Sequence, residues 1–317
     1  MSYSPRPLRR HALPFLLLLT GLLMAVAAVA TACGKDGEEE AAGGGRIKVV
    51  TSIELFADLI RPVAGERAEV VALIPAGADP HTYEPVPSKI ADISKADLVL
   101  LNGVGLEETL MDVIKNNVGS GVPVVEMSAG LPVLQGEDQG TGNPHLWLNV
   151  RNAMHYVEAA RDALIQVDPE GEAVYGANAQ AYLAELEDLD RQMEQDIASI
   201  PAERRKLVTS HDAFPYLAER YGLELVGVVV RSPGQEPSAR EVADLARTIE
   251  DQNVPAVFAE PQFSARVLEL AAEDAGVAVC ALYSDAFDDD VHTYVELVRF
   301  DAAELVRCLA NGGSADQ

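Results

Sequence analysis

The sequence predicts an α/β protein of two parallel-sheet lobes joined by a single long helix. Short apolar segments alternate with amphipathic stretches between residues 46 and 168, and the same alternation returns after residue 200. This alternation is typical of βαβ units whose parallel strands are covered on both faces. Between the two halves, the chain from Glu170 to Ile200 shows one continuous helical pattern without proline.

The first half is expected to form an N-terminal lobe over residues 46–168. The expected strands are Ile47–Thr51, Val70–Ile74, Leu98–Leu101 and Val122–Val125. The expected helices are Leu55–Val63, Ser88–Lys95 and Glu107–Asn117.

The long helix is expected within residues 169–200. Tyr182, Leu186, Leu189 and Met193 recur at steps of three and four residues, which gives the helix one apolar face. A coiled-coil segment is the alternative interpretation. The position between two α/β halves favours a helix that links two lobes.

The second half is expected to form a C-terminal lobe over residues 201–311, followed by a tail at 312–317. Gly222 is a typical helix stop, and Ser238 with Glu241 forms a capping-box pattern at a helix start. The expected strands are Leu207–Thr209, Leu225–Val230, Val257–Ala259 and Val277–Tyr283. The expected helices are Phe214–Tyr221, Ser238–Gln252, Ala265–Ala275 and Tyr294–Leu309.

The first residues predict export. Residues 1–32 combine three arginines, a long apolar run and small residues, which is the pattern of a signal peptide. Cys33 follows at once and resembles the lipidated cysteine of a bacterial lipoprotein. Residues 33–45 are polar and Gly-rich, as in a flexible tether. The sequence therefore predicts a protein held by lipid at the extracytoplasmic face of the membrane, with an uncleaved transmembrane anchor as the alternative.

The charge excludes one class of partner. The formal net charge is −26, and removing the three arginines of residues 1–32 leaves −29. Such a chain is repelled by nucleic acid, so no nucleic-acid partner is expected. If Cys33 carries lipid, Cys280 and Cys308 remain, either as a disulfide of an exported protein or as two separate thiols.

Three histidines and one aspartate occupy similar turn-forming contexts. His81, His145 and His211 follow Pro80, Pro144 and Ser210, and Asp285 comes after a predicted strand. Ligands of open parallel sheets bind beyond the carboxyl ends of the strands. These four side chains are therefore expected to form one metal site between the lobes, with two ligands from each half.

Nitrogen and oxygen donors suit Zn²⁺, Mn²⁺ or Fe²⁺. Three imidazoles favour zinc, because nitrogen ligands bind it better than manganese. The turn residues Asp79 and Asp212 are expected to orient the imidazoles. Other candidates stay open: a histidine after a proline is often only a turn residue, and three acidic neighbours compete with Asp285, namely Asp288, Asp289 and Asp290. His155 and His292 are expected on the surface of helical stretches.

Five stretches resemble the zinc- and manganese-binding receptor lipoproteins of ABC importers. They are Gly77–Pro85, Asn143–Asn149, Ser210–Leu217, Glu260–Ser264 and Tyr283–Asp285. The resemblance implies two lobes joined by one helix, a buried metal and delivery of that metal to an ABC permease by a monomeric receptor. It also implies His81, His145, His211 and Asp285 as the ligands.

Two departures leave the metal open within this resemblance. Zinc-dedicated members often carry a His-rich loop before the second ligand, whereas residues 134–142 contain no histidine. Manganese-dedicated members often have glutamate at the position of His211.

Two other functions compete with a metal receptor. A zinc hydrolase needs an open coordination position and a general base, and the chain has no H-E-x-x-H or G-x-S-x-G motif. A receptor for a metal chelate, such as a siderophore or cobalamin, can share the two-lobed plan without four inward ligands. The sequence favours a binding protein over an enzyme.

Overall fold

The computed structural model describes residues 46–135, 140, 142–230 and 237–310. The predicted signal peptide, the tether with Cys33 and the tail at 312–317 lie outside these residues. Among the described residues, no helix combines the length and apolar character needed to cross a bilayer.

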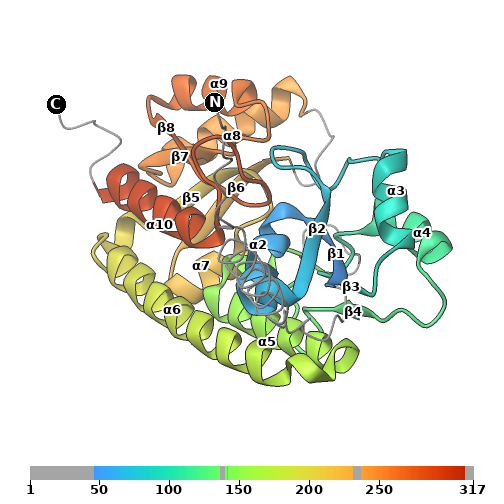
Figure 1. The fold of residues 1–317 in the computed structure, drawn as a ribbon. Helices are drawn as coiled ribbons and strands as arrows, with labels where there is room; N and C mark the ends of the chain where they lie inside the picture. Colours follow the sequence, from blue (N-terminus) through green and yellow to red (C-terminus); the bar gives the residue numbers. More distant parts are fainter. Residues whose placement is uncertain (1–45, 136–139, 141, 231–236, 311–317) are drawn as a thin grey trace, which may run out of the picture. The chain divides into compact units, whose positions relative to one another are not determined.

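The body contains two four-stranded parallel sheets (Figure 1). The first has the order β2-β1-β3-β4 and the second β6-β5-β7-β8. The strands of the first sheet are β1 Ile47–Ile53, β2 Ala68–Ile74, β3 Leu98–Leu101 and β4 Val124–Glu126. Those of the second are β5 Lys206–His211, β6 Glu224–Val230, β7 Ala256–Ala259 and β8 Ala278–Ala281. The predicted α/β fold is confirmed.

Each sheet has the same switch in strand order. The chain passes from the first strand to an edge strand, then crosses back to the other side of the first strand. Such a switch point is where parallel sheets bind ligands. In the second sheet it lies between β5 and β7, which pair at Thr209 and Phe258.

The helices of the first lobe are α2 Glu54–Ala64, α3 Pro87–Ser94, α4 Glu108–Asn117 and α5 Val150–Val167. Those of the second half are α7 Pro215–Tyr221, α8 Ala239–Asp251, α9 Arg266–Ala275 and α10 Tyr294–Leu305. The predicted capping box opens α8, and α7 stops at Gly222 in the left-handed conformation that glycine adopts without strain. The predicted last helix ends at Leu305, and a short π-helix, Val306–Ala310, continues the chain.

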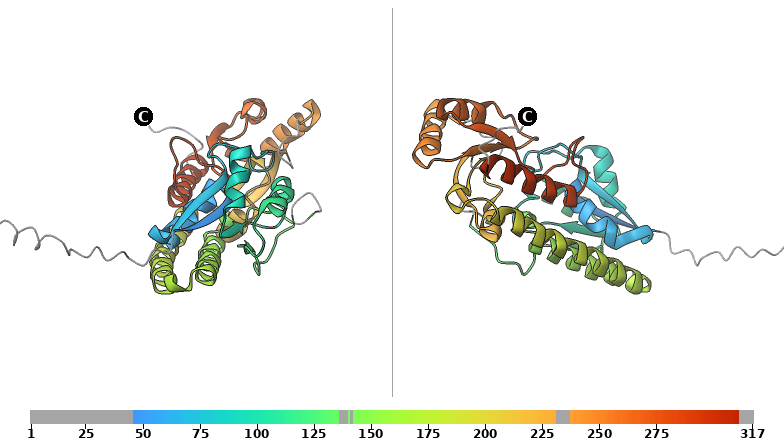
Figure 2. Two further views of the ribbon diagram at one scale, coloured as in Figure 1. Left: turned by 45° about the vertical axis from the view of Figure 1, so that its right-hand side comes forward. Right: turned by 90° about the vertical axis from the view of Figure 1, so that its left-hand side faces the viewer.

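The long helix is α6, Glu172–Ala198. Its 27 residues span about 40 Å. It packs against α2, α5 and α7, and α10 returns from the second lobe to lie beside it (Figure 2). Its buried face contains the predicted Tyr182, Leu186, Leu189 and Met193. The exact boundaries that we assign to lobes and link, 46–168, 169–200 and 201–311, remain a proposal.

A buried ion cluster fastens α6 to its neighbours. Asp190 on α6 accepts hydrogen bonds from Arg220 and Tyr221 of α7, at 2.6 and 2.9 Å, and from Arg151 of α5 at 3.1 Å. Asp190 is 4% exposed. Burial opposes its ionisation, but the arginines and the tyrosine outweigh burial and lower its pKa.

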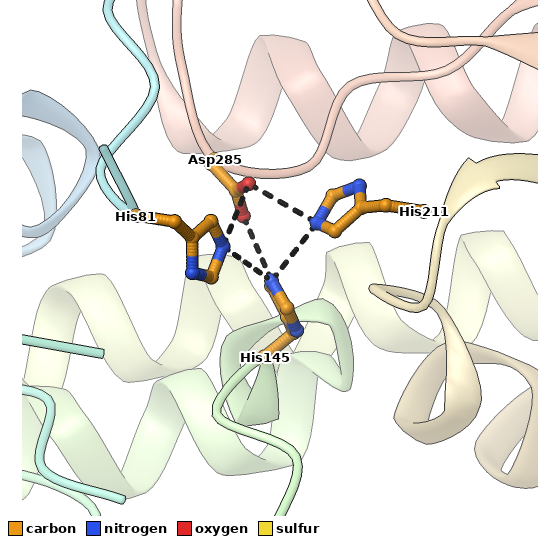
Figure 3. A group of neighbouring side chains, drawn as sticks. All are labelled: His81, His145, His211 and Asp285. Atoms are coloured by element: carbon orange, nitrogen blue, oxygen red, sulfur yellow. Dashed lines mark hydrogen bonds and ion pairs between the residues drawn. The ribbon is translucent and has the colours of Figure 1, made fainter. Parts of the chain in front are cut away.

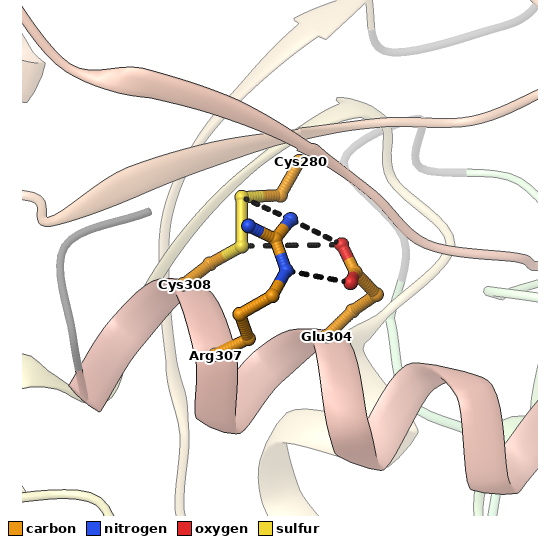
Figure 4. Close-up of a disulfide and its surroundings, with 4 residues drawn as sticks. All are labelled: Cys280, Glu304, Arg307 and Cys308. Carbon is orange, nitrogen blue, oxygen red and sulfur yellow. Dashed lines mark hydrogen bonds and ion pairs between the residues drawn. A yellow bond between two sulfur atoms is a disulfide. The ribbon is translucent and has the colours of Figure 1, made fainter. Parts of the chain in front are cut away.

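A disulfide joins Cys280 of β8 to Cys308, just after α10 (Figure 4). Of the two possibilities left open by the sequence, the structure has the disulfide. Beside it, Arg307 pairs with Glu304 at 2.7 Å. The bond ties the segment that follows α10 to the strand that leads toward Asp285.

Candidate metal site

Four side chains from four separate segments point toward one another (Figure 3). His81 lies in the loop between β2 and α3, and His145 immediately precedes a short 3-10 turn, Leu146–Leu148. His211 is the last residue of β5, and Asp285 lies between β8 and α10. The structure therefore brings together all four residues that the sequence proposed.

The distances between the donor atoms are short and similar. Nε2 of His145 is 3.3 Å from Nε2 of His81 and 3.2 Å from Nε2 of His211. The Asp285 carboxylate lies 3.4 Å from the nearest nitrogen of both His145 and His211, and 3.7 Å from that of His81. Zinc–nitrogen bonds of 2.0–2.1 Å arranged as a tetrahedron place ligand atoms about 3.3–3.4 Å apart. The observed spacing suits one four-coordinate ion.

The carboxylate of Asp285 is buried without a hydrogen bond. Its side chain has no exposed surface, and neither Oδ1 nor Oδ2 has a hydrogen-bond partner among the described residues. An ionised carboxylate left this way is costly unless a cation compensates it. The orphaned oxygens therefore fit a cation at the centre of the four side chains.

In two imidazoles a neighbouring oxygen fixes Nδ1 as a hydrogen-bond donor. Oδ1 of Asn143 accepts the backbone N–H of His145, so this atom acts as an acceptor. Nδ1 of His145, which lies 2.9 Å from the same oxygen, is therefore the donor. Nδ1 of His211 donates to Oε1 of Glu260, also at 2.9 Å. Each ring thus turns Nε2 toward the common centre, the arrangement by which outer groups orient metal ligands.

The environment separates the pKa values of these two rings. Burial and the neighbouring imidazoles hold the pKa of His145 well below its usual range, although Asp285 opposes them. Burial also disfavours the charged form of His211, but Glu260 and Asp285 outweigh it and raise its pKa to about 10. Without metal at neutral pH, His145 is therefore neutral and His211 carries a proton.

Asp79 does not orient an imidazole as expected. Its Oδ1 accepts the backbone N–H of His81 at 2.9 Å and its Oδ2 accepts the hydroxyl of Thr82, so it shapes the loop itself. The backbone carbonyl of Asp212 accepts a hydrogen bond from the side-chain amide of Asn143, at 2.6 Å. This bond links the His145 segment to the His211 segment.

The alternative candidates lie outside the four-residue group. Asp288 accepts the hydroxyl of Tyr283 at 2.7 Å and the backbone N–H groups of residues 290 and 291, while Asp289 and Asp290 are exposed. His155 is part of α5 and faces the carbonyl of Ala129. The expectation that His292 is in a helix is wrong: it is exposed and lies two residues before α10.

The sequence also matches a known protein family over most of its length. The model of the family ZnuA, described as the periplasmic component A of a zinc-uptake complex, matches residues 49–308. The chain belongs to this family. The family consists of metal-binding receptors of ABC importers and not of enzymes.

Relatives within the family are named for different metals. The manganese-binding lipoprotein MntA of Halalkalibacterium halodurans is 34% identical over 91% of this chain and 97% of its own. The iron-binding protein YfeA of Yersinia pestis is 32% identical over 92% of this chain and 94% of its own. The solved periplasmic zinc-binding protein TroA of Treponema pallidum superposes with a TM-score of 0.78 at 31% identity, covering 84% of this chain and 100% of that structure.

Sequence reasoning assigned no role to Asn143, Trp147 or Glu260. Glu260 directly follows β7, so its position at the carboxyl end of a strand was the available signal. Asn143 stands two residues before His145, where an amide can bond its own turn. Trp147 gave no such signal, because its indole bonds to a residue 137 positions away.

Proposed function

We propose that the protein captures one divalent transition-metal ion with His81, His145, His211 and Asp285 and delivers it to an ABC-type permease. The observation that carries this proposal is the buried, unpartnered carboxylate of Asp285 facing three imidazole nitrogens at 3.4–3.7 Å. The bound ion is cargo, so the site has to release it as well as hold it.

The charges of the site balance for a divalent ion. Asp285 is the only carboxylate among the described residues that faces the centre, and Glu260 stands behind His211 as a second one. A divalent cation with these two carboxylates and three neutral imidazoles leaves no net charge in a buried region. This balance avoids the cost of an uncompensated buried charge.

We propose that solvent reaches the site past His81. Its side chain is 19% exposed, whereas those of His145, His211 and Asp285 are 3%, 1% and 0% exposed. The cargo then enters and leaves on the His81 side without unpacking the other three ligands.

Zinc is the cargo that the donor set favours, with manganese next and iron(II) as a further alternative. Affinity for nitrogen and oxygen sites rises from manganese through iron toward zinc, and a four-coordinate site suits zinc. Similarity to known relatives does not decide between these metals, because different relatives are named for manganese, iron and zinc.

We further propose that the receptor is a monomer, exported by residues 1–32 and held at the extracytoplasmic face of the membrane through lipid on Cys33. The names of relatives support this location, since several are lipoproteins. Labelling cells with a radioactive fatty acid tests it. The expected label on the wild-type protein should disappear in a Cys33→Ala variant.

Competition titrations on metal-stripped protein test the cargo. Zn²⁺, Mn²⁺ and Fe²⁺ (anaerobically) are titrated against a chromogenic chelator, and cobalamin and a ferric siderophore are added separately. The expected result is tight binding of the free ions, with zinc bound most tightly. Binding of a chelate without binding of free ions would favour a chelate receptor instead.

A further inference from the structure

Ser284 lies at the centre of a set of hydrogen bonds and ring contacts that reaches three of the four proposed ligands. It immediately precedes Asp285 and is completely buried. Its side-chain and backbone oxygens make contacts in different directions, one within the second lobe and one across to the first.

The hydroxyl of Ser284 connects Asp285 to His211. It donates to Oε2 of Glu260, and Nε2 of Gln262 donates to it at 2.8 Å. The other oxygen of Glu260 accepts both the ring N–H of His211, at 2.9 Å, and its backbone N–H, at 3.2 Å. One carboxylate therefore spans the serine and the histidine ligand.

The backbone carbonyl of Ser284 connects Asp285 to the segment of His145. It accepts the indole N–H of Trp147 at 2.8 Å. The Trp147 ring lies 5.3 Å from the His145 ring, centroid to centroid, and the Trp147 carbonyl accepts the hydroxyl of Tyr294 at 2.6 Å. The residues on either side of the metal site are thus bonded to each other across the lobes.

His81 stands outside this network. The backbone N–H of His81 bonds within its own loop, to Asp79, and the His81 side chain is the most exposed of the four. Asp285 itself accepts no hydrogen bond from the part of the chain that the structure describes, so the position of its carboxylate depends on the backbone that Ser284 holds.

We propose, building on the proposed function, that Ser284 is a positioning residue for the metal site. It fixes the position of Asp285 relative to His211 through Glu260, and relative to His145 through Trp147. Three ligands then form a preorganised platform before the metal arrives, and His81 completes the coordination. Such outer groups typically change metal affinity by about 10- to 100-fold.

The first test compares two buried serines that donate to buried glutamates. Ser284→Ala removes the bond to Glu260, whereas the control Ser52→Ala removes the bond of Ser52 to Glu107, at 2.7 Å, within the first lobe. Zinc affinity of the stripped proteins is measured by chelator competition, and unfolding of the metal-free forms is measured in parallel. We expect Ser284→Ala to lower the zinc affinity about tenfold or more. Ser52→Ala should change the zinc affinity less than about threefold.

A spectroscopic measurement separates positioning from general destabilisation. Cobalt(II) bound in place of zinc gives ligand-field absorption bands that depend on the arrangement of the donors. We expect Ser284→Ala to shift these bands and Ser52→Ala to leave them unchanged. Ser284→Thr, which retains a hydroxyl, should restore the wild-type bands. The emission of Trp147, the only tryptophan in the chain, should respond to metal in both alanine variants, which shows that the site still fills.

A double-mutant cycle keeps the proposal testable if the threonine does not fit. If the hydroxyl acts through Glu260, Ser284→Ala should have little further effect on zinc affinity in a Glu260→Gln background. Equal losses for Ser284→Ala and Ser52→Ala, unchanged cobalt bands or additive effects in the cycle would each overturn the role of Ser284. Failure of the wild-type protein to bind zinc, cobalt, manganese or iron would instead overturn the proposed function.

Discussion

Nδ1 of His211 lies 2.9 Å from Oε1 of Glu260, and both side chains are almost completely buried. Burial opposes the charged form of this imidazole, but Glu260 together with Asp285 raises its pKa to about 10. An incoming cation therefore meets a protonated ring and has to displace the proton on Nε2, because Nδ1 remains bonded to Glu260. Metal binding and proton release are coupled at this one residue.

The first prediction is that zinc affinity still rises with pH well above neutrality. An unperturbed histidine, with a pKa near 6.5, is already neutral there and causes no further change. With His211 titrating near 10, the association constant should increase about tenfold per pH unit between about pH 7.5 and 9. Chelator competition in a pH series measures this slope.

The matched control for the pH series is Glu260→Gln. Loss of the carboxylate removes the main group that raises the pKa of His211, so the slope above pH 7.5 should flatten. Calorimetry in buffers of different ionisation enthalpy should also show about one proton released per zinc ion at pH 7.5 in the wild-type protein. A flat affinity in the wild type would show that His211 is already neutral.

The second prediction concerns the cluster around Asp190. Asp190→Asn should lower the free energy of unfolding at neutral pH by about 3 kcal/mol, because it removes the charge of the buried carboxylate that pairs with Arg220 at 2.6 Å. The folded-state pKa is lowered, so this stabilisation is present above the ordinary pKa near 3.8 and is lost as pH falls through the folded value. Urea unfolding of the metal-free proteins at several pH values measures the difference.

Asp188→Asn is the control for that cluster. Asp188 pairs with Arg191 on the same helix, but its side chain is 73% exposed, so its removal should cost less than about 1 kcal/mol. If Asp188→Asn is as damaging as Asp190→Asn, the buried cluster has no special role in holding α6.

The third prediction separates stability from metal binding at the disulfide. Replacing Cys280 and Cys308 together by alanine removes a link across 28 positions of the chain, which should destabilise the protein by about 3 kcal/mol. Zinc affinity should change less than about threefold, since neither sulfur faces the site. Thermal unfolding and chelator competition on the same sample measure both effects. A large loss of affinity would mean that the disulfide also holds the Asp285 segment.

The sequence predicted the alternation of strands and helices, the long helix and the four converging residues for one shared reason. Each depends on local patterns, namely apolar periodicity, turn residues and the carboxyl ends of strands. His211 illustrates this, because a histidine directly after an apolar strand segment in a parallel sheet belongs to the ligand-binding edge whatever the order of the strands.

Features that depend on strand order or lobe contact could not be predicted in this way. Glu260 reaches His211 because β7 lies beside β5, and periodicity does not reveal that order. Trp147 reaches Ser284 only because the two lobes pack together. For α5, only a helical stretch around His155 was expected and its bounds were not predicted, although Asn149 caps the helix and it packs along α6. The pairing of Cys280 with Cys308 likewise follows from the proximity of β8 and α10.

The fourth prediction concerns the stoichiometry of the site, and it tests the central claim most directly. Metal-stripped wild-type protein is equilibrated with zinc at a concentration well above the dissociation constant, desalted and measured for zinc per chain. A variant with His81, His145 and His211 all replaced by alanine is treated in the same way. We expect one zinc ion per wild-type chain and none tightly held by the variant, whose fold is checked by circular dichroism. One equivalent retained by the triple variant would contradict this account, because the metal would then bind elsewhere.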